Sequence, residues 1–224
     1  SFYGGVNYFT PDRSGFVHYD YQAGNLSNLY YSYIGEMTAD KHGNLWVSTD
    51  GGGLGCINEN WELVHQFTAG GLNSIPHNNV KSICYDQEND YLYIGTHLGG
   101  LSRYDFQKKS FYNYLEHQLE NTPAPRHFIY QVKMWNGKLY LSSREGAEGN
   151  FYANQADKVV IVPFSDVTQR STLKLQDMGY KGSISHVRVT KDGAYICTLG
   201  SGLLFYDRNI KKMIVYNTEN STLP

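Results

Sequence analysis

A glycine turn of fixed pattern returns along this chain, and it restricts the possible folds more than any other feature. Each copy places two glycines, or a serine and a glycine, before an apolar residue, and the fourteenth residue after the second glycine is aromatic. The turns are Gly4-Gly5-Val6, Gly52-Gly53-Leu54, Gly99-Gly100-Leu101 and Ser201-Gly202-Leu203. The aromatic residues that follow them are Tyr19, Phe67, Tyr114 and Tyr216. Constant spacing across the copies indicates one supersecondary unit that is repeated.

Each repeat is typical of four short antiparallel strands. Runs rich in β-branched and aromatic residues alternate with Asp, Asn and Gly clusters, which favour hairpin turns because they tolerate left-handed backbone angles. In one clear copy the strands are expected at Val80–Tyr85, Leu92–Thr96, Leu101–Tyr104 and Phe111–Tyr114. Four strands in roughly 45 residues is the size of a propeller blade. The sequence therefore predicts an all-β chain, a β-propeller fragment of about four and a half four-stranded blades from a ring of about seven.

The copies divide the chain into blade pieces, of which the fourth is degenerate. The expected pieces are 1–20 (partial), 30–68, 78–115, 127–164 and 183–217. In the fourth, Gly149 takes the place of the second glycine, and the strands are expected at Ile129–Met134, Leu139–Ser143, Phe151–Asn154 and Val159–Phe164. The polar stretch that follows, Ser165 to Ser183, is longer than the other connections between blades. We expect it to project as a loop that contacts a ligand or a neighbouring domain.

The composition argues against several classes of partner. With 19 basic and 21 acidic residues the formal net charge is −2, so we expect neither nucleic acid binding nor membrane contact by this fragment. No apolar run approaches the ~20 residues that span a bilayer. The cysteines Cys56, Cys84 and Cys197 fall within predicted strands, which favours buried apolar roles over disulfides.

Some motifs suggest chemistry but also have a structural interpretation. The run Gly51–Gly55 could hold a phosphate, but a strand rather than a helix is expected after it, which favours a plain turn. The histidines lack ligand spacing, so we expect no metal and no cofactor. Most carboxylates recur at turn positions of the repeat, and we predict no catalytic residues. Glu145 and Glu148 remain open as a catalytic pair.

The repeat between Ser74 and Asp105 resembles the two-component regulator propeller repeat. The matching residues are Asn78-Asn79-Val80, Leu92-x-Ile94-Gly95-Thr96 and Gly99-Gly100-Leu101-x-x-Tyr104-Asp105, and the run from Asp40 to Leu54 is a second close match. The resemblance implies a non-enzymatic periplasmic sensor module of an inner-membrane-anchored hybrid two-component regulator. Such a module detects a carbohydrate signal and passes it to a histidine kinase outside this fragment. The alternative is a non-catalytic propeller scaffold that docks another protein domain.

Aromatic and polar residues that the repeat does not explain form a candidate ligand site. They lie in or beside the loops that join strand two to strand three, or one blade to the next, and in propellers these loops share one face. Aromatic ring faces beside amide and charged groups suit an oligosaccharide. The candidate ligand-binding residues are Phe2, Tyr3, Tyr31, Tyr33, His97, His127, Arg144 and Glu145.

The predicted blade pieces do not close a ring. The first offers strands three and four, while the last ends before a new first strand. Since closure is what removes exposed strand edges, we expect an open arc that self-associates and buries Phe2, Tyr8 and the outer face of the last blade. Its other partners are expected to be the remaining blades and domains of the parent chain.

Overall fold

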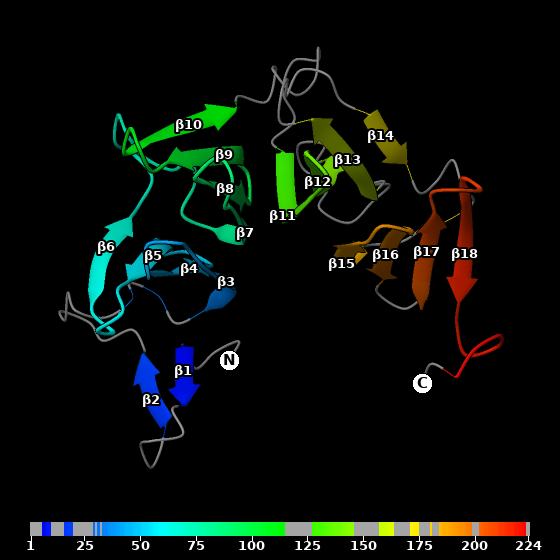
Figure 1. Cartoon of the computed structure of the whole chain (residues 1–224), viewed down its shortest axis with the longest axis horizontal. Helices are drawn as coiled ribbons and strands as arrows, with labels where there is room; N and C mark the ends of the chain where they lie inside the picture. Colours follow the sequence, from blue (N-terminus) through cyan, green and yellow to red (C-terminus); the bar gives the residue numbers. More distant parts are fainter. Residues whose placement is uncertain are drawn as a thin grey trace. The chain divides into compact units, whose positions relative to one another are not determined.

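The computed structural model describes residues 6–9, 16–19, 29, 31, 33–114, 127–145, 157–163, 171–174, 180, 184–198 and 202–222. Within them the regular structure consists of β-strands in antiparallel sheets (Figure 1). These residues include no apolar helix of bilayer-spanning length. The chain divides into two compact units, Ser1–Tyr114 and Leu115–Pro224. The predicted all-β class is confirmed.

The first unit holds one two-stranded sheet and two four-stranded sheets. The small sheet pairs β1 (Val6–Phe9) with β2 (Phe16–Tyr19). The next sheet is formed by β3 (Ile34–Ala39), β4 (Leu45–Thr49), β5 (Gly53–Ile57) and β6 (Leu63–Phe67). The third is formed by β7 (Val80–Asp86), β8 (Tyr91–Thr96), β9 (Gly100–Asp105) and β10 (Ser110–Tyr114). Each strand pairs with its neighbours in the sequence, which is the order within a propeller blade.

The second unit repeats this pattern with two four-stranded sheets. One is formed by β11 (His127–Trp135), β12 (Lys138–Glu145), β13 (Asp157–Pro163) and β14 (Ser171–Lys174). The other is formed by β15 (Ile184–Val189), β16 (Gly193–Thr198), β17 (Leu203–Asp207) and β18 (Lys212–Tyr216). In each unit the first strands of successive sheets lie together, β3 with β7 and β11 with β15. First strands that gather in this way are the inner strands of propeller blades.

The fourth repeat differs from its prediction in its last two strands. Its first two strands lie where expected, but the third is β13, in which Val159 pairs with Ser142 of β12. Of the run predicted as the outer strand, Val159–Phe164, the residues up to Pro163 therefore belong to the third strand. Phe164 and the run Phe151–Asn154 lie outside the described residues. The outer strand is β14, within the stretch predicted to be a loop, so this sheet extends to Lys174.

The prediction for the fourth repeat is wrong because it aligns this copy on Gly149. Residues 146–156 separate β12 from β13, so the insertion is longer than that alignment allows. The third strand carries Val159-Val160-Ile161-Val162, whose branched side chains suit a central strand. By contrast, β14 is the short run Ser171-Thr172-Leu173-Lys174 at the sheet edge, where little burial is needed and the sequence signal is weak.

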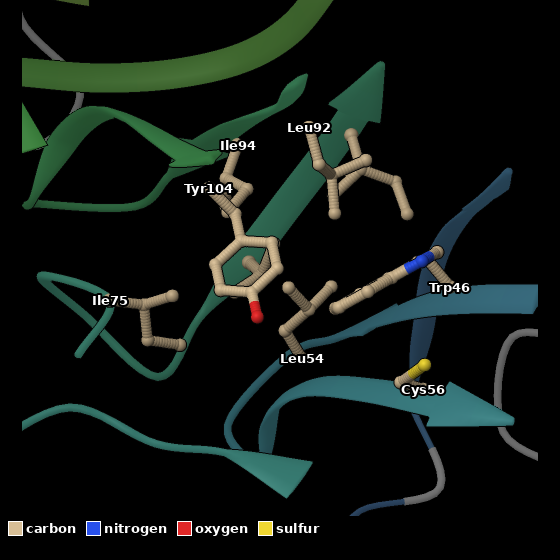
Figure 2. Close-up of a cluster of buried hydrophobic side chains, with 9 residues drawn as sticks. Trp46, Leu54, Cys56, Ile75, Leu92, Ile94 and Tyr104 are labelled. Carbon is tan, nitrogen blue, oxygen red and sulfur yellow. The ribbon is translucent and has the colours of Figure 1, made fainter. Parts of the chain in front are cut away.

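Aromatic and aliphatic side chains fill the space between the β3–β6 and β7–β10 sheets. Trp46 of β4 is 2% exposed. Its ring centroid lies 5.9 Å from that of Phe67 and 5.6 Å from that of Tyr104 on the next sheet. Figure 2 shows Trp46 and Leu54 together with Leu92 and Tyr104 in this cluster. Each large side chain buried here contributes about 1.5–3 kcal/mol, so this interface holds the two blades together.

The second unit builds the equivalent interface from different side chains. Tyr140 of β12 occupies the repeat position of Trp46, because each follows the leucine near the start of the second strand. It packs in a buried cluster with Val187, Ile196 and Leu204 of the following sheet. An aromatic residue that packs against the next sheet is therefore a property of the repeat.

A polar side chain on the inner strand adds a hydrogen bond to the next blade in both units. Glu36 of β3 accepts from the backbone N–H of Ile83 on β7, with 3.2 Å between Oε2 and N. Gln131 of β11 accepts from the backbone N–H of Val187 on β15, with 2.6 Å between Oε1 and N. Both acceptors lie at an irregularity in the strand register. A bulge at such a point changes the direction of a side chain, here toward the next blade.

Close packing requires glycine at the second position of two of these turns. Gly53 has a φ of +86°, and a Cβ at this position would lie 2.1 Å from the carbonyl oxygen of Phe67. Gly202 has a φ of +80°, and its Cβ would lie 2.1 Å from the carbonyl oxygen of Tyr216. The backbone conformation and the contact both exclude an L side chain. In these two copies the fourteen-residue spacing brings the glycine against the backbone carbonyl of the aromatic residue, whereas a Cβ at Gly100 would lie 3.6 Å from the carbonyl oxygen of Tyr114.

We expect Gly53→Ala to lower the free energy of unfolding by about 3 kcal/mol or more, because strain and a backbone collision act together. Gly70→Ala is the matched control: its φ is +109°, but nothing lies within 4 Å of its Cβ position, so the expected loss is about 1 kcal/mol. Urea unfolding followed by tryptophan fluorescence measures both. Equal losses would contradict the role given to the Phe67 carbonyl.

Candidate ligand-binding face

In two of the sheets, the segment that precedes the first strand packs over the turn between the second and third strands. In the β3–β6 sheet this segment carries Tyr31, and a Cβ at Gly52 would meet the Cβ of Tyr31 at 2.7 Å. In the β7–β10 sheet it carries His77, and a Cβ at Gly99 would meet the Cβ of His77 at 3.0 Å. Tyr31 and His77 therefore occupy equivalent positions over their turns.

One backbone frame holds both turns. The N–H of Asp50 donates to the carbonyl oxygen of Tyr33 at 2.8 Å, and the N–H of His97 donates to the carbonyl oxygen of Asn79 at 2.9 Å. In each turn the threonine that ends the second strand also donates its hydroxyl to the carbonyl oxygen of the second glycine. The frame is constant between these repeats, and the side chains that it presents differ.

The turn of one blade pairs with the segment that enters the next. The N–H groups of Gly51 and Gly53 donate to the carbonyl oxygen of Asn78 at 3.2 and 2.8 Å. Asp50 and Asn79 form an isolated antiparallel β-bridge. These contacts bring the side chains of both turns to the same end of the two sheets.

An ion pair joins the two blades at this end. The Nζ of Lys81 lies 2.5 Å from the Oδ2 of Asp50, and the two side chains are 26% and 34% exposed. Lys81 lies in the register shift of β7 between Val80 and Ser82, and the shift turns its side chain toward the preceding blade. The second carboxylate oxygen of Asp50, Oδ1, is buried and has no hydrogen-bond partner.

Two histidines lie beside this ion pair. The rings of His77 and His97 meet edge to face with centroids 6.5 Å apart, and Nδ1 of His77 accepts from the N–H of Asn79 at 3.0 Å. Burial of His97, followed by the positive charge of Lys81, holds its pKa below the usual 6.5, although Asp50 opposes this shift. His97 is therefore neutral at pH 7, with one ring nitrogen able to donate and the other to accept.

Two tyrosines complete this end of the sheets. The rings of Tyr31 and Tyr33 are 5.4 Å apart between centroids, and Tyr31 is 40% exposed. The Cζ of Tyr31 would lie 3.1 Å from a Cβ at Gly51, so its hydroxyl end covers the turn. We call this end of the two sheets the loop-end face; it consists of Tyr31, Tyr33, Asp50, His77, Lys81 and His97.

The structure places the predicted ligand residues of the first unit as follows. Tyr31 and Tyr33 lie together at the turn of the β3–β6 sheet, and His97 lies with His77 at the turn of the β7–β10 sheet. Phe2 and Tyr3 lie outside the described residues.

The predicted ligand residues of the second unit lie at one end of the β11–β12 pair. His127 pairs with Glu145, and Arg144 pairs with Phe128. In the β11–β12 pair, Ser143 is opposite Ile129, and Arg144 comes next in the sequence. In the β3–β4 pair, Thr49 is opposite Ile34, and Asp50 comes next. The backbone thus places Arg144 at the repeat position of Asp50 and His97.

Asp50, His77 and Lys81 belong to the face but not to the residues predicted from the sequence. Asp50 shares its repeat position with His97, and His77 shares that of Tyr31, so aligning the copies residue by residue would have identified both. Lys81 carries no such signal, because strand alternation does not reveal a bulge.

Other candidate motifs have structural roles. The carboxylates of Asp86 and Asp207 accept from backbone N–H groups two and three residues later, as turn residues do. The run Gly51–Gly55 leads into β5 and not into a helix. Within the described ranges, His, Cys, Asp and Glu do not gather in groups of three that could hold a metal ion.

Titration of His97 tests the geometry of the face. Because the charge of Lys81 lowers the pKa of His97 and that of Asp50 raises it, we expect Lys81→Met to raise this pKa toward 6.5 and Asp50→Asn to lower it further. The histidine ring protons, followed by NMR between acid and neutral pH, give the values. A His97 resonance that titrates alike in all three proteins would show that the ion pair lies elsewhere.

Comparisons with known proteins identify the fold. No family model and no curated relative matches the sequence. The extracellular domain assigned to the hybrid two-component system BT3049 of B. thetaiotaomicron aligns with a TM-score of 0.69 at 18% identity, over 95% of this chain and 27% of that one. The corresponding domain of BT4673 aligns with a TM-score of 0.68 at 15% identity, over 97% and 28%. The β-propeller domain of Cps50 (Swd1) from Myceliophteria thermophila gives 0.51 at 12% identity, over 84% and 56%.

The chain spans 27% and 28% of the length of the two bacterial domains. At this level of identity the likeness is one of fold. The resemblance read from the repeat is confirmed at that level: this chain is a β-propeller fragment with the architecture found in extracellular domains of hybrid two-component systems.

Proposed function

We propose that this chain is part of the extracytoplasmic sensing region of a hybrid two-component regulator and that its loop-end face binds an oligosaccharide. The fold shared with the extracellular domains of such systems supports the first part. In this proposal the parent protein is anchored in the inner membrane, and the signal passes to a histidine kinase outside the fragment.

The observation that carries the binding proposal is the pair of turns with one backbone frame and different side chains. Tyr31 and Asp50 on one turn correspond to His77 and His97 on the next. A symmetric array would offer the same group from every blade. Varied side chains on a constant frame create the asymmetric surface that recognition of one ligand requires.

The side chains present suit a sugar. Tyr31 offers a ring that is 40% exposed, on which the C–H face of a pyranose can pack. Asp50 on the same turn and His97 on the next turn carry groups of the kinds that hydrogen-bond with hydroxyls. A few polar groups next to an aromatic surface are typical of small-molecule sites.

We expect the ligand to be released unchanged. The six residues of the loop-end face include one carboxylate, Asp50, which is paired with Lys81. Glycoside hydrolysis uses two carboxyl groups, one of which stays protonated to act as an acid. The loop-end face therefore lacks the second carboxyl group that this reaction needs.

Binding at this face would also affect how two blades meet. Tyr31 and Asp50 belong to the β3–β6 blade, while Lys81 and His97 belong to the β7–β10 blade. A ligand that contacts both favours the blade spacing in which all contacts are made. This gives a physical route from occupancy to a change in the rest of the parent protein.

The binding proposal is tested with Tyr31→Ala. In calorimetric titrations against a panel of plant and host oligosaccharides, we expect at least one ligand, and about tenfold weaker binding by Tyr31→Ala because a stacking surface is lost. Tyr112→Ala is the matched control: Tyr112 is 49% exposed and also packs on a tyrosine, Tyr114, at 4.9 Å. The control should bind as the unaltered protein does. Chromatography of the recovered sugar should show no new products.

The docking scaffold is the second candidate. Leu72 is fully exposed on the segment between β6 and β7, and this segment is tied to the next blade by Asn73, whose side chain donates to the carbonyl oxygen of Lys109 at 3.0 Å. A panel without any ligand would contradict the sensing proposal. Loss of association with another domain of the parent protein in Leu72→Glu would then favour docking.

A further inference from the structure

The charges on the loop-end face balance each other. Asp50 and Lys81 are 2.5 Å apart, and His97 stays neutral near pH 7 because burial and Lys81 disfavour its cation. The face therefore presents polar groups without an unpaired positive charge among its described residues.

Asp50 has unused capacity to accept hydrogen bonds. Lys81 occupies one carboxylate oxygen, whereas Oδ1 is buried and has no hydrogen-bond partner. A carboxylate accepts several hydrogen bonds, and its terminal torsion is soft. The side chain is 34% exposed, so a small rotation can offer one oxygen to a ligand while Lys81 keeps the other. Sugar hydroxyls are donors of the right kind.

An anionic ligand has no comparable partner here. To reach Lys81, a carboxylate or sulfate must come within a few ångströms of Asp50, where like charges repel. Displacing Asp50 from Lys81 instead would leave Asp50 without its counter-ion in a partly buried place, at a cost in free energy. Neutral hydroxyls avoid both penalties.

We propose that the loop-end face selects neutral oligosaccharides, which pack a ring face on Tyr31 and donate hydroxyls to Asp50, and that it discriminates against uronic acids and sulfated sugars. This selectivity rests on the proposed oligosaccharide-binding function. Asp50 is its specificity-determining residue.

Matched sugar pairs test the selectivity. Galactotetraose and tetragalacturonic acid, both α-1,4-linked, share their ring stereochemistry and differ at C6, where the second carries a carboxylate. Cellotetraose and its C6-oxidised counterpart form a second pair, and the best ligand from the panel with its C6-oxidised form a third. Calorimetry at pH 7 and low salt should give at least about tenfold tighter binding of the neutral member, the effect of one hydrogen bond to a charged group.

Asp50→Asn separates selectivity from folding. It keeps the shape of the side chain but releases Lys81 from its ion pair, so the neutral member should bind more weakly and the acidic member more tightly. Such a reversal cannot come from a misfolded protein. Asp105→Asn is the control: Asp105 also lies near a lysine, Lys108, at 3.8 Å, but at the opposite end of β9. It should leave both affinities unchanged.

The two proposals fail differently. If no sugar in any pair or in the panel binds, the oligosaccharide function itself is contradicted. If sugars bind but the acidic members bind as well as or better than the neutral ones, only the selectivity is overturned. Unchanged selectivity in Asp50→Asn would likewise overturn the role of Asp50.

Discussion

The contact between the second glycine of the turn and a strand carbonyl constrains two of the repeats, those of Gly53 and Gly202. At Gly53 and Gly202 a Cβ would lie 2.1 Å from the carbonyl oxygen of the aromatic residue fourteen positions later. Only glycine lets the fourth strand lie that close to the start of the third. The contact fixes the register of this hairpin, and in the first unit it aims Phe67 at Tyr104 of the next sheet.

Two kinds of interaction then join one blade to the next. Apolar burial around Trp46 and around Tyr140 provides the larger stabilisation, but it is not directional. Glu36 and Gln131 on one inner strand accept hydrogen bonds from backbone N–H groups of the next inner strand. Because hydrogen bonds are directional, these fix the position of the two strands relative to each other. The repeat keeps both features while it changes the side chains, which is how successive blades pack alike despite different sequences.

The division between frame and side chains also explains the proposed sensing role. In the β3–β6 and β7–β10 sheets the turns keep glycine and threonine, whose hydroxyl donates to the carbonyl oxygen of the second glycine. The residue after the threonine varies and is aspartate in one blade and histidine in the next. The bulge that presents Lys81 to Asp50 places an ion pair between these two blades. In the proposed function, a ligand that engages this pair would act on the contact between the two blades as well as on one surface.

The sequence by itself determined the all-β class, the four-stranded repeat and the strand bounds of the third copy to within one residue. A hairpin is local, and its spacing and turn residues recur. It also identified Tyr31, Tyr33 and His97 as loop residues. The tertiary structure decided the outer strands of the fourth repeat, where an insertion and a polar edge strand obscure the pattern. It alone paired Lys81 with Asp50, thirty-one positions apart, and left one oxygen of Asp50 unpaired. Such contacts depend on how two blades pack and on a bulge, and no periodic pattern in the sequence encodes either.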